Sequence, residues 1–281
     1  MPKNKVCTRL ALVLGSLFLL GCTPESPFQQ SNLVAWCIVP FDAAERSPEE
    51  RARMLSELGI SKFAYDWRRQ HVEEFEREII ACQKEGIEFF AFWNEHPEAF
   101  RLFEKYGMQP QIWKTLRSPA SGLAQSERIA AAGTAFLPLV EKTRQMGSKL
   151  GLYNHGGWGG EPENLVAVIE WLRKETDAEH VGIVYNLHHG HDHLDRFAEG
   201  IELMKPYLLC LNLNGMNREP DPKILAIGQG SRDQEWFQAL VKSGYNGPIG
   251  ILGHQSDRDA RECLEEDLVG LKKLHAHLPN D

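Results

Sequence analysis

Short apolar runs alternate with longer amphipathic runs from Asn32 almost to the end of the chain, and this alternation constrains the fold most. It is typical of βα units arranged around a parallel sheet. No composition break divides the units, and no glycine-rich phosphate-binding turn follows the first strand, where an open dinucleotide-binding sheet would carry one. We therefore predict an α/β fold with a single closed (β/α)8 TIM barrel; an open sheet with a small cap domain is the alternative. The expected strands are residues 33–39, 62–66, 88–93, 111–115, 149–153, 181–186, 208–213 and 248–252.

Helix start and stop signals lie between these runs. Ser47 is placed to cap the first helix, with Pro48 at the first helical position. Gly86 is placed to end the second helix. The later helices are expected at residues 71–84, 97–106, 124–146, 163–176, 194–205, 234–243 and 258–274.

The first residues resemble a bacterial lipoprotein signal peptide. A basic start precedes an apolar run from Leu10 to Leu20, which is too short to span a bilayer comfortably, and Gly21-Cys22 ends it in the manner of a lipobox. The resemblance implies that residues 1–21 are removed and that Cys22 is lipidated. It implies an extracytoplasmic protein of the bacterial cell envelope, with a lipid anchor in the membrane.

The remaining chain is acidic and long enough for one barrel. Without residues 1–21 it has 28 basic and 39 acidic residues, a formal balance of −11, which argues against nucleic acid as a partner. Residues 22–32, rich in Pro, Ser and Gln, are expected to be a flexible tether. Residues 33–281 have about the length of one α/β barrel domain.

Four cysteines remain in the mature region. Their spacings fit neither a disulfide framework nor a CxxC metal site. Because two of them lie in apolar strand-like runs, we expect buried free thiols. They are Cys37, Cys82, Cys210 and Cys263.

Polar residues gather where the expected strands end, which is where (β/α)8 barrels carry their active sites. The densest stretch is 181–193, in which a strand-like run is followed by Asn186 and four histidines. Two of these histidines, His191 and His193, fall at the start of the next helix and are expected to be exposed. The strand-end candidates are Asp66, Trp67, Arg68, Trp93, Glu95, Trp113, Lys114, Asn154, His155, Trp158, Asn186, His188, His189, Asn212, Asn214 and His254.

Four of these candidates are tryptophans: Trp67, Trp93, Trp113 and Trp158. They either seal the barrel top or form stacking surfaces for sugar rings, and both can hold together. An aromatic pocket with a few convergent polar groups is the usual form of a small-molecule site. We expect a small-molecule carbohydrate as the ligand, with the polar candidates binding its hydroxyl groups.

Several segments resemble the xylose isomerase-like barrel superfamily, which contains sugar isomerases, sugar epimerases and type-IV apurinic endonucleases. They are the turn Ile227-Gly-Gln-Gly230, the following residues 236–240 and 244–249, and the strand-like segment 181–189. The resemblance implies a TIM barrel with activity on carbohydrates. Nuclease activity is disfavoured by the acidic charge and by the expected location.

The chain departs from the metal site of that family. Its members typically hold a divalent metal with a glutamate after strand five, an aspartate and a histidine on strand six, a histidine on strand seven and a glutamate after strand eight. The corresponding residues here are Asn154 or His155, Asn186, His189, Asn212 or Asn214, and Gly253-His254. Because Mg²⁺ and Mn²⁺ favour carboxylate oxygens, the usual carboxylate cage is absent.

Two explanations remain for this departure. His155, His189 and His254 could together bind one divalent metal ion (Zn, Co, Ni or Mn), with coordination positions left open for the substrate. Alternatively, the site is metal-free, with Lys114 and the asparagines stabilising an oxyanion while a histidine or Glu95 moves protons. The sequence slightly favours the first explanation, in which the three histidines bind a metal ion.

The expected activity is that of a sugar isomerase, an epimerase or a lyase. All three begin by removing a proton next to a carbonyl, with Glu95 or His155 as the base and Lys114 or a metal as the electrophile. Free or oxidised sugars and glycosides suit an extracytoplasmic enzyme, and a keto-glycoside lyase is one specific possibility. The competing hypothesis is a surface sugar-binding protein that has lost its catalytic carboxylates.

Overall fold

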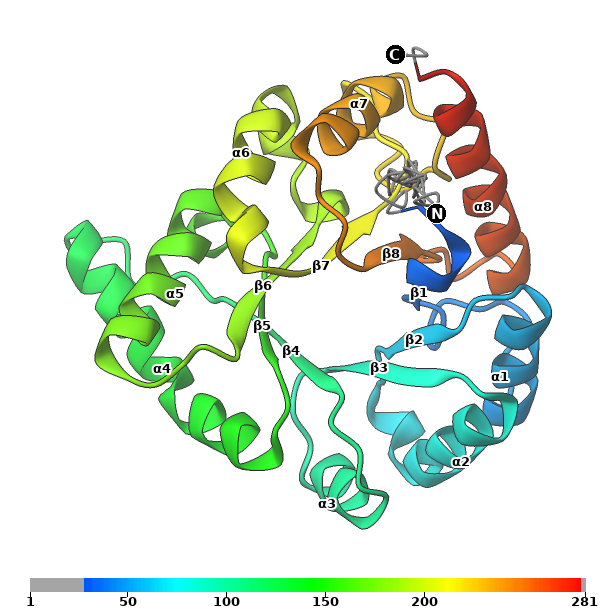
Figure 1. Ribbon diagram of the computed structural model, residues 1–281, viewed down its shortest axis with the longest axis horizontal. Coiled ribbons are helices and arrows are strands. Elements are labelled where there is room, and N and C mark those ends of the chain that lie inside the picture. Colours follow the sequence, from blue (N-terminus) through cyan, green and yellow to red (C-terminus); the bar gives the residue numbers. More distant parts are fainter. Residues whose placement is uncertain (1–27, 279–281) are drawn as a thin grey trace, which may run out of the picture.

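The computed structural model describes residues 28–278 and has eight parallel strands that close into a barrel. Each strand pairs with the next along the chain, and β1 (Leu33–Trp36) pairs with β8 (Ile249–Leu252) to complete the ring. Figure 1 shows the helices surrounding this ring of strands. The predicted (β/α)8 barrel is confirmed.

The strand positions follow the prediction closely. The strands between β1 and β8 are β2 (Lys62–Tyr65), β3 (Glu88–Trp93), β4 (Gln111–Thr115), β5 (Leu150–Tyr153), β6 (Val181–Asn186) and β7 (Leu208–Leu213). The α-helices are α1 (Pro48–Glu57), α2 (Phe75–Glu85), α3 (Pro97–Lys105), α4 (Gln125–Met146), α5 (Pro162–Glu175), α6 (Phe197–Met204), α7 (Asp233–Ser243) and α8 (Ala260–Ala276). Short 3-10 helices are η1 (Gln30–Asn32), η2 (Arg69–Glu74), η3 (Trp158–Gly160), η4 (Leu187–His189), η5 (His191–Arg196) and η6 (Lys205–Tyr207).

The ends of the first two helices follow from local chemistry. Ser47 and Glu50 form a capping box at the start of α1, with Pro48 in the first turn. Gly86 ends α2 in the left-handed conformation, at φ +70°. The second helix starts later than predicted, because residues 69–74 form η2 before the α-helix begins at Phe75.

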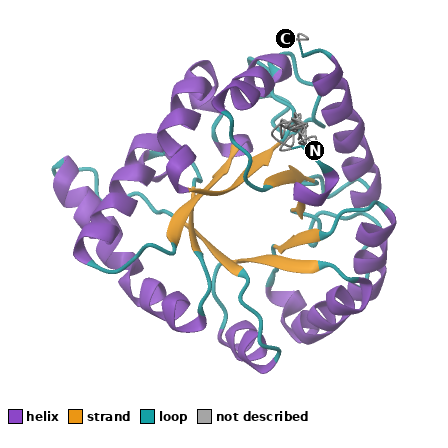
Figure 2. Ribbon diagram, viewed as in Figure 1, coloured by secondary structure: helices purple, strands orange, loops and turns teal. Residues whose placement is uncertain are grey.

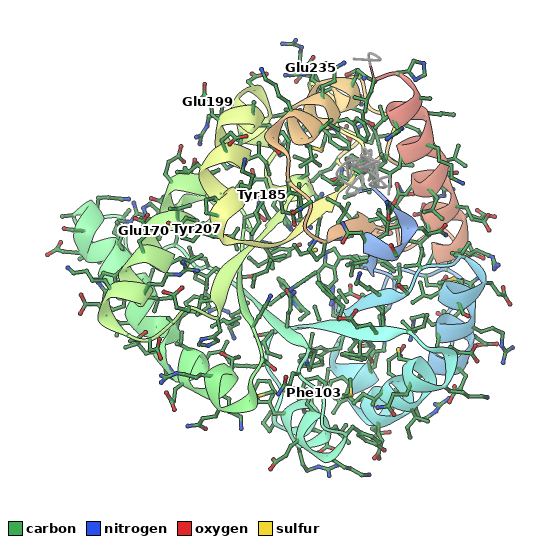
Figure 3. The ribbon with its side chains drawn as sticks, viewed as in Figure 1. Phe103, Glu170, Tyr185, Glu199, Tyr207 and Glu235 are labelled. Carbon is green, nitrogen blue, oxygen red and sulfur yellow. The ribbon has the colours of Figure 1, made fainter. Side chains whose placement is uncertain are left out.

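Side chains alternate between two apolar layers. The outward-facing layer packs under the helices and includes Phe63, Ile112 and Ile183. The inward-facing layer fills the barrel and includes Trp36, Trp113 and Tyr153. Figure 2 shows the two concentric layers of strands and helices. Figure 3 shows side chains filling the centre of the ring, while Glu199 on α6 and Glu235 on α7 lie at the outer rim.

Glycines make room for the larger residues inside the barrel. A Cβ on Gly250 of β8 would lie 1.9 Å from Oδ1 of Asn212 on β7. A Cβ on Gly151 of β5 would lie 2.4 Å from a methyl carbon of Val184 on β6. The interior is therefore packed by pairing small residues with large ones on neighbouring strands.

The four predicted free thiols, Cys37, Cys82, Cys210 and Cys263, are free and buried, as expected. Cys22, the signal-like residues 1–21 and most of the proposed tether lie outside the described residues. Within residues 28–278, no helix is both long enough and apolar enough to cross a membrane.

Gly250→Ala should destabilise the barrel, because the added methyl group overlaps Asn212 in a packed interior. Overpacking of this kind costs about 1–3 kcal/mol. Urea denaturation measures the loss. The matched control is Gly122→Ala, whose added methyl group meets nothing within 4 Å. Equal stability of the two variants would contradict the tight contact between β7 and β8.

Candidate active site at the barrel mouth

A small cavity lined by both aromatic and polar side chains lies at the carboxyl ends of the strands. Its volume is about 70 Å³. This is the end at which TIM barrels carry their active sites. The cavity is lined by Trp36, Cys37, Asp66, Arg68, Trp93, Tyr153, His155, His189 and His254.

Asp66 supplies the carboxyl group of this cavity. It directly follows β2, and only 1 % of its surface is exposed. Its Oδ1 accepts a long hydrogen bond of 3.4 Å from the backbone N–H of Val39, while Oδ2 has no hydrogen-bond partner among the described residues. Burial raises the pKa of Asp66 to about 7, and the nearby charge of Arg68 offsets only part of that effect. Asp66 can therefore both accept and donate a proton near neutral pH.

Arg68 brings a positive charge to the same cavity. Its Nη1 donates hydrogen bonds to the backbone carbonyls of Asp66 at 2.8 Å and Trp67 at 2.9 Å. Its guanidinium carbon lies 5.5 Å from the ring centre of Phe41, which in turn lies 3.9 Å from the ring centre of His254. The cation is thus held beside Asp66 by backbone hydrogen bonds and by a cation–π contact with Phe41.

The histidines form a row of neighbouring rings. The ring centre of His189 lies 4.1 Å from that of His155 and 4.4 Å from that of His188, and His188 lies 5.1 Å from His254. Burial is the main cause that lowers the pKa of His188 to about 3, that of His189 to about 2 and that of His254 to about 4. These three imidazoles are neutral at neutral pH, so each ring can donate one hydrogen bond and accept another.

The arrangement does not fit the three-histidine metal site that the sequence favoured. The rings of His155 and His189 lie in contact, with centres 4.1 Å apart and an interplanar angle of 37°. Among residues 28–278, no group of three or more His, Cys, Asp and Glu side chains is arranged to hold a metal ion. The single carboxyl group of the cavity, Asp66, leaves few of the oxygen ligands that hard cations need.

Asn186 forms hydrogen bonds with several neighbouring protein groups through both its side chain and its backbone. Its Oδ1 accepts from the backbone N–H of His188 at 3.1 Å, and its Nδ2 donates to the hydroxyl of Tyr153. Its backbone N–H and C=O pair with the side chain of Asn154 at 2.6 and 3.0 Å. Asn186 and Asn154 therefore tie β5 to β6 and position the histidines of η4. Neither residue lines the cavity.

The asparagines of the seventh strand also lie inside the protein. Asn212 and Asn214 are completely buried. Asn212 accepts a weak hydrogen bond from the thiol of Cys210 at 3.4 Å, and Asn214 donates to the backbone carbonyl of Gly215 at 2.8 Å. Neither residue lines the cavity.

Only one of the four candidate tryptophans, Trp93, lines the cavity. Trp113 is completely buried in the barrel beneath it and bonds to Gln111 at 2.9 Å. Trp67 packs edge-on against Phe75 of α2. Trp158 bonds to Gln125 of α4 at 2.9 Å. These three tryptophans therefore do not line this cavity, and their contacts agree with the alternative that they pack the barrel and its top.

Glu95 and Lys114 pair with each other away from the cavity. Their side chains lie 2.7 Å apart and line a separate pocket of about 320 Å³ against α4. The reason is the alternation along β4, where Trp113 points into the barrel and Lys114 therefore points outward. The structure does not place Glu95 or Lys114 beside the histidines, whereas His155, the other candidate base, lines the cavity next to His189.

His193 corrects another expectation. It was expected to be exposed, but it is buried. Its Nδ1 lies 2.9 Å from the hydroxyl of Tyr185, and its Nε2 lies 3.1 Å from the carboxylate of Glu161. Through Glu161, the N-cap residue of α5, His193 connects η5 to the start of α5. His191, by contrast, is partly exposed and contacts the backbone carbonyl of Arg218 at 2.9 Å.

The sequence interpretation missed three cavity residues: Trp36, Cys37 and Tyr153. The alternation of side chains along a strand could have identified two of them. Along β1 and β5 it places Trp36 and Tyr153 on the inward face, together with Val34 and Gly151. Cys37 departs from this alternation because its backbone adopts a φ of +55°, which no sequence pattern indicates.

Residues 49–274 match the family described as xylose isomerase-like TIM barrel, so the chain belongs to this family. The predicted resemblance is confirmed. None of the curated proteins matches the sequence.

Solved structures with the same fold include sugar epimerases. The 3-keto-D-glucoside 4-epimerase YcjR from E. coli is 15 % identical, with a TM-score of 0.63 over 88 % of this chain and 99 % of that one. D-psicose 3-epimerase from Clostridium cellulolyticum H10, solved with D-tagatose, is 12 % identical, with a TM-score of 0.61 over 89 % and 100 %. The IolI protein, solved with a zinc atom, is 12 % identical, with a TM-score of 0.66 over 89 % and 100 %. At these identities the likeness concerns the fold.

Asp66→Asn should make folding stability less dependent on pH. Burial raises the pKa of Asp66 to about 7, so ionisation of this carboxyl group destabilises the folded state. The destabilisation is absent below the ordinary pKa of about 4 and is complete above about pH 7. The variant should therefore gain up to about 4 kcal/mol over the wild type between about pH 4 and about pH 8. Urea denaturation at both pH values measures this.

Asp259→Asn is the matched control for this measurement. The hydrogen bond from Arg46 lowers the pKa of Asp259, so this substitution should cost more stability at high pH than at low pH. An Asp66→Asn effect of the same sign as that of Asp259→Asn would contradict the assigned environment.

Metal analysis should find far less than one metal ion per chain in protein purified without a histidine tag. The physical reason is that no three His, Cys, Asp or Glu side chains among residues 28–278 are arranged as metal ligands. His189→Ala should leave the metal content unchanged. One bound metal per wild-type chain, lost in His189→Ala, would restore the three-histidine hypothesis.

Proposed function

We propose that this protein is a carbohydrate isomerase or epimerase in which Asp66 removes a proton next to a carbonyl group. One observation carries the proposal: a buried carboxyl group with an unpartnered oxygen lines the cavity at the barrel mouth. A general base works best when its pKa lies near the working pH, and the pKa of Asp66 is about 7.

The other cavity residues suit the same chemistry. Removal of the proton places negative charge on the carbonyl oxygen, and Arg68 is the cation available at the cavity to stabilise it. The neutral rings of His189 and His254 can donate to or accept from sugar hydroxyls. Trp93 offers an aromatic face to the apolar side of a sugar ring. No metal is needed in this scheme.

The expected location narrows the substrate class. The lipobox-like segment ending in Cys22 supports an enzyme anchored in the cell envelope and acting outside the cytoplasm. Free or oxidised sugars and glycosides then suit the site better than sugar phosphates. A lyase acting on keto-glycosides begins with the same proton removal, and the similarity to a 3-keto-D-glucoside epimerase makes such glycosides worth testing.

Exchange of a sugar C–H proton into D₂O, followed by NMR, tests the proposal. The probes are D-fructose, D-tagatose, their aldose partners and 3-keto-glucosides. The wild type should exchange the proton next to the carbonyl of at least one of them. Asp66→Asn should slow this exchange by about 10²-fold or more, because it removes the base.

Asp177→Asn is the matched control, because Asp177 is exposed on the loop between α5 and β6, away from the cavity. Glu95→Gln decides between Asp66 and Glu95 as the base, and His155→Ala tests the third candidate. If Glu95→Gln abolishes exchange while Asp66→Asn does not, Asp66 is not the base. Binding heats in calorimetry with no exchange for any probe would indicate the alternative function, a surface sugar-binding protein.

A further inference from the structure

Cys37 is turned into the active-site cavity by an unusual backbone conformation. It follows β1 directly and has a φ of +55°, in the left-handed region that residues other than glycine rarely adopt. Successive side chains of a strand point to opposite faces, yet Trp36 and Cys37 both line the cavity. The left-handed φ breaks the alternation. Such conformations cost about 1–3 kcal/mol and persist where the surrounding structure enforces them.

Cys37 and Asp66 line the same cavity from neighbouring paired strands, because Cys37 directly follows β1 and Asp66 directly follows β2. The backbone N–H of Val39, two residues after Cys37, donates to Oδ1 of Asp66 at 3.4 Å. In this arrangement the charge of Asp66 adds to the effect of burial in raising the pKa of the Cys37 thiol. Cys37 and Asp66 are almost completely buried, at 5 % and 1 % exposure. The unpartnered Oδ2 of Asp66 is an independent sign that this wall of the cavity is built to meet a ligand. Of the four cysteines in the described part of the chain, only Cys37 lines this cavity.

The pair combines an acid and a base on one side of the cavity. Burial, followed by the charge of Asp66, raises the pKa of the Cys37 thiol, so the thiol stays protonated near neutral pH. A protonated thiol is a weak hydrogen-bond donor and can give up its proton. Asp66, beside it, can take one.

We infer that Cys37 is the general acid that works with Asp66, and that the pair interconverts aldoses and ketoses from one face of the substrate. This inference rests on the proposed function and names its reaction type. Two adjacent groups can reach one face of a planar enediol. Inversion at a carbon requires proton transfer on opposite faces, which this pair does not provide.

The proton transfers balance without a further reactant. Asp66 takes the proton from the carbon next to the carbonyl, and the Cys37 thiol gives its proton to the carbonyl oxygen, which forms the enediol. The Cys37 thiolate then takes the proton of the neighbouring hydroxyl as a new carbonyl forms there. Asp66 returns its proton to the former carbonyl carbon. Both groups end in their starting states.

Three substitutions of Cys37 separate an acid from a merely structural residue. Cys37→Ala removes the donor and should lower kcat for aldose–ketose interconversion by about 10²-fold, with KM changed much less. Cys37→Ser keeps an O–H donor and should retain most of the rate. Cys37→Gly also removes the donor, but glycine adopts the φ of +55° without strain, so a loss of rate here cannot be attributed to backbone strain.

The same NMR experiment distinguishes failure of this inference from failure of the proposed function. If the wild type exchanges protons and Cys37→Ala and Cys37→Gly keep its rate, Cys37 is not the acid, and the role of Asp66 stands. If the wild-type product is an epimer inverted at one carbon, the single-face reaction is wrong. If the wild type exchanges no proton of any probe, both proposals fall.

Alkylation by iodoacetamide, followed by mass spectrometry of each cysteine, gives a readout independent of turnover. The sugar that supports exchange should protect Cys37 from alkylation at saturating concentration. Cys263, which is also 5 % exposed but lies on α8, serves as the internal control and should be unaffected. Equal alkylation of Cys37 with and without the sugar would overturn its place in the binding site.

Discussion

The alternation of side chains along each strand is the constraint on which the site depends. Closing the sheet into a barrel gives every strand an inner and an outer face, so a shift of one residue moves a side chain from the cavity to the helix layer. Trp113 and Lys114 show this directly: the first is buried inside the barrel and the second pairs with Glu95 outside the cavity. Within the strands, only inward-facing residues such as Trp36, Trp93 and Tyr153 reach the cavity, and the loops that follow the strands supply its other lining residues.

The fold could be predicted because its signals are local and repeated. Cap residues such as Ser47 and Gly86 act within one turn, and the apolar periodicity of each strand repeats around the barrel. The site was predicted only in part. Asp66, Arg68, Trp93, His155, His189 and His254 do line the cavity. The other strand-end candidates lie elsewhere, because a polar residue near the end of a strand can face the cavity, the helices or the packed interior.

Two features of the site depend on tertiary contacts that no local pattern reveals. The pKa of Asp66 is raised mainly by burial at the barrel mouth, and its neighbours in the chain do not reveal that burial. Asn186 stands where the family usually has an aspartate, which suggested a modified metal site. In the structure its groups are used by Tyr153, His188 and Asn154, and the residue holds the histidines in place.

The contact between Gly250 and Asn212 has a consequence for how this barrel can evolve. Asn212 occupies the space in which any side chain at position 250 would lie. A larger residue at 250 is therefore tolerated only together with a smaller one at 212, so the two positions are expected to change jointly during divergence. Both positions lie in the packed interior of the barrel. A double substitution at this pair is a route by which descendants of this sequence can change the packing between β7 and β8 while keeping the strand order.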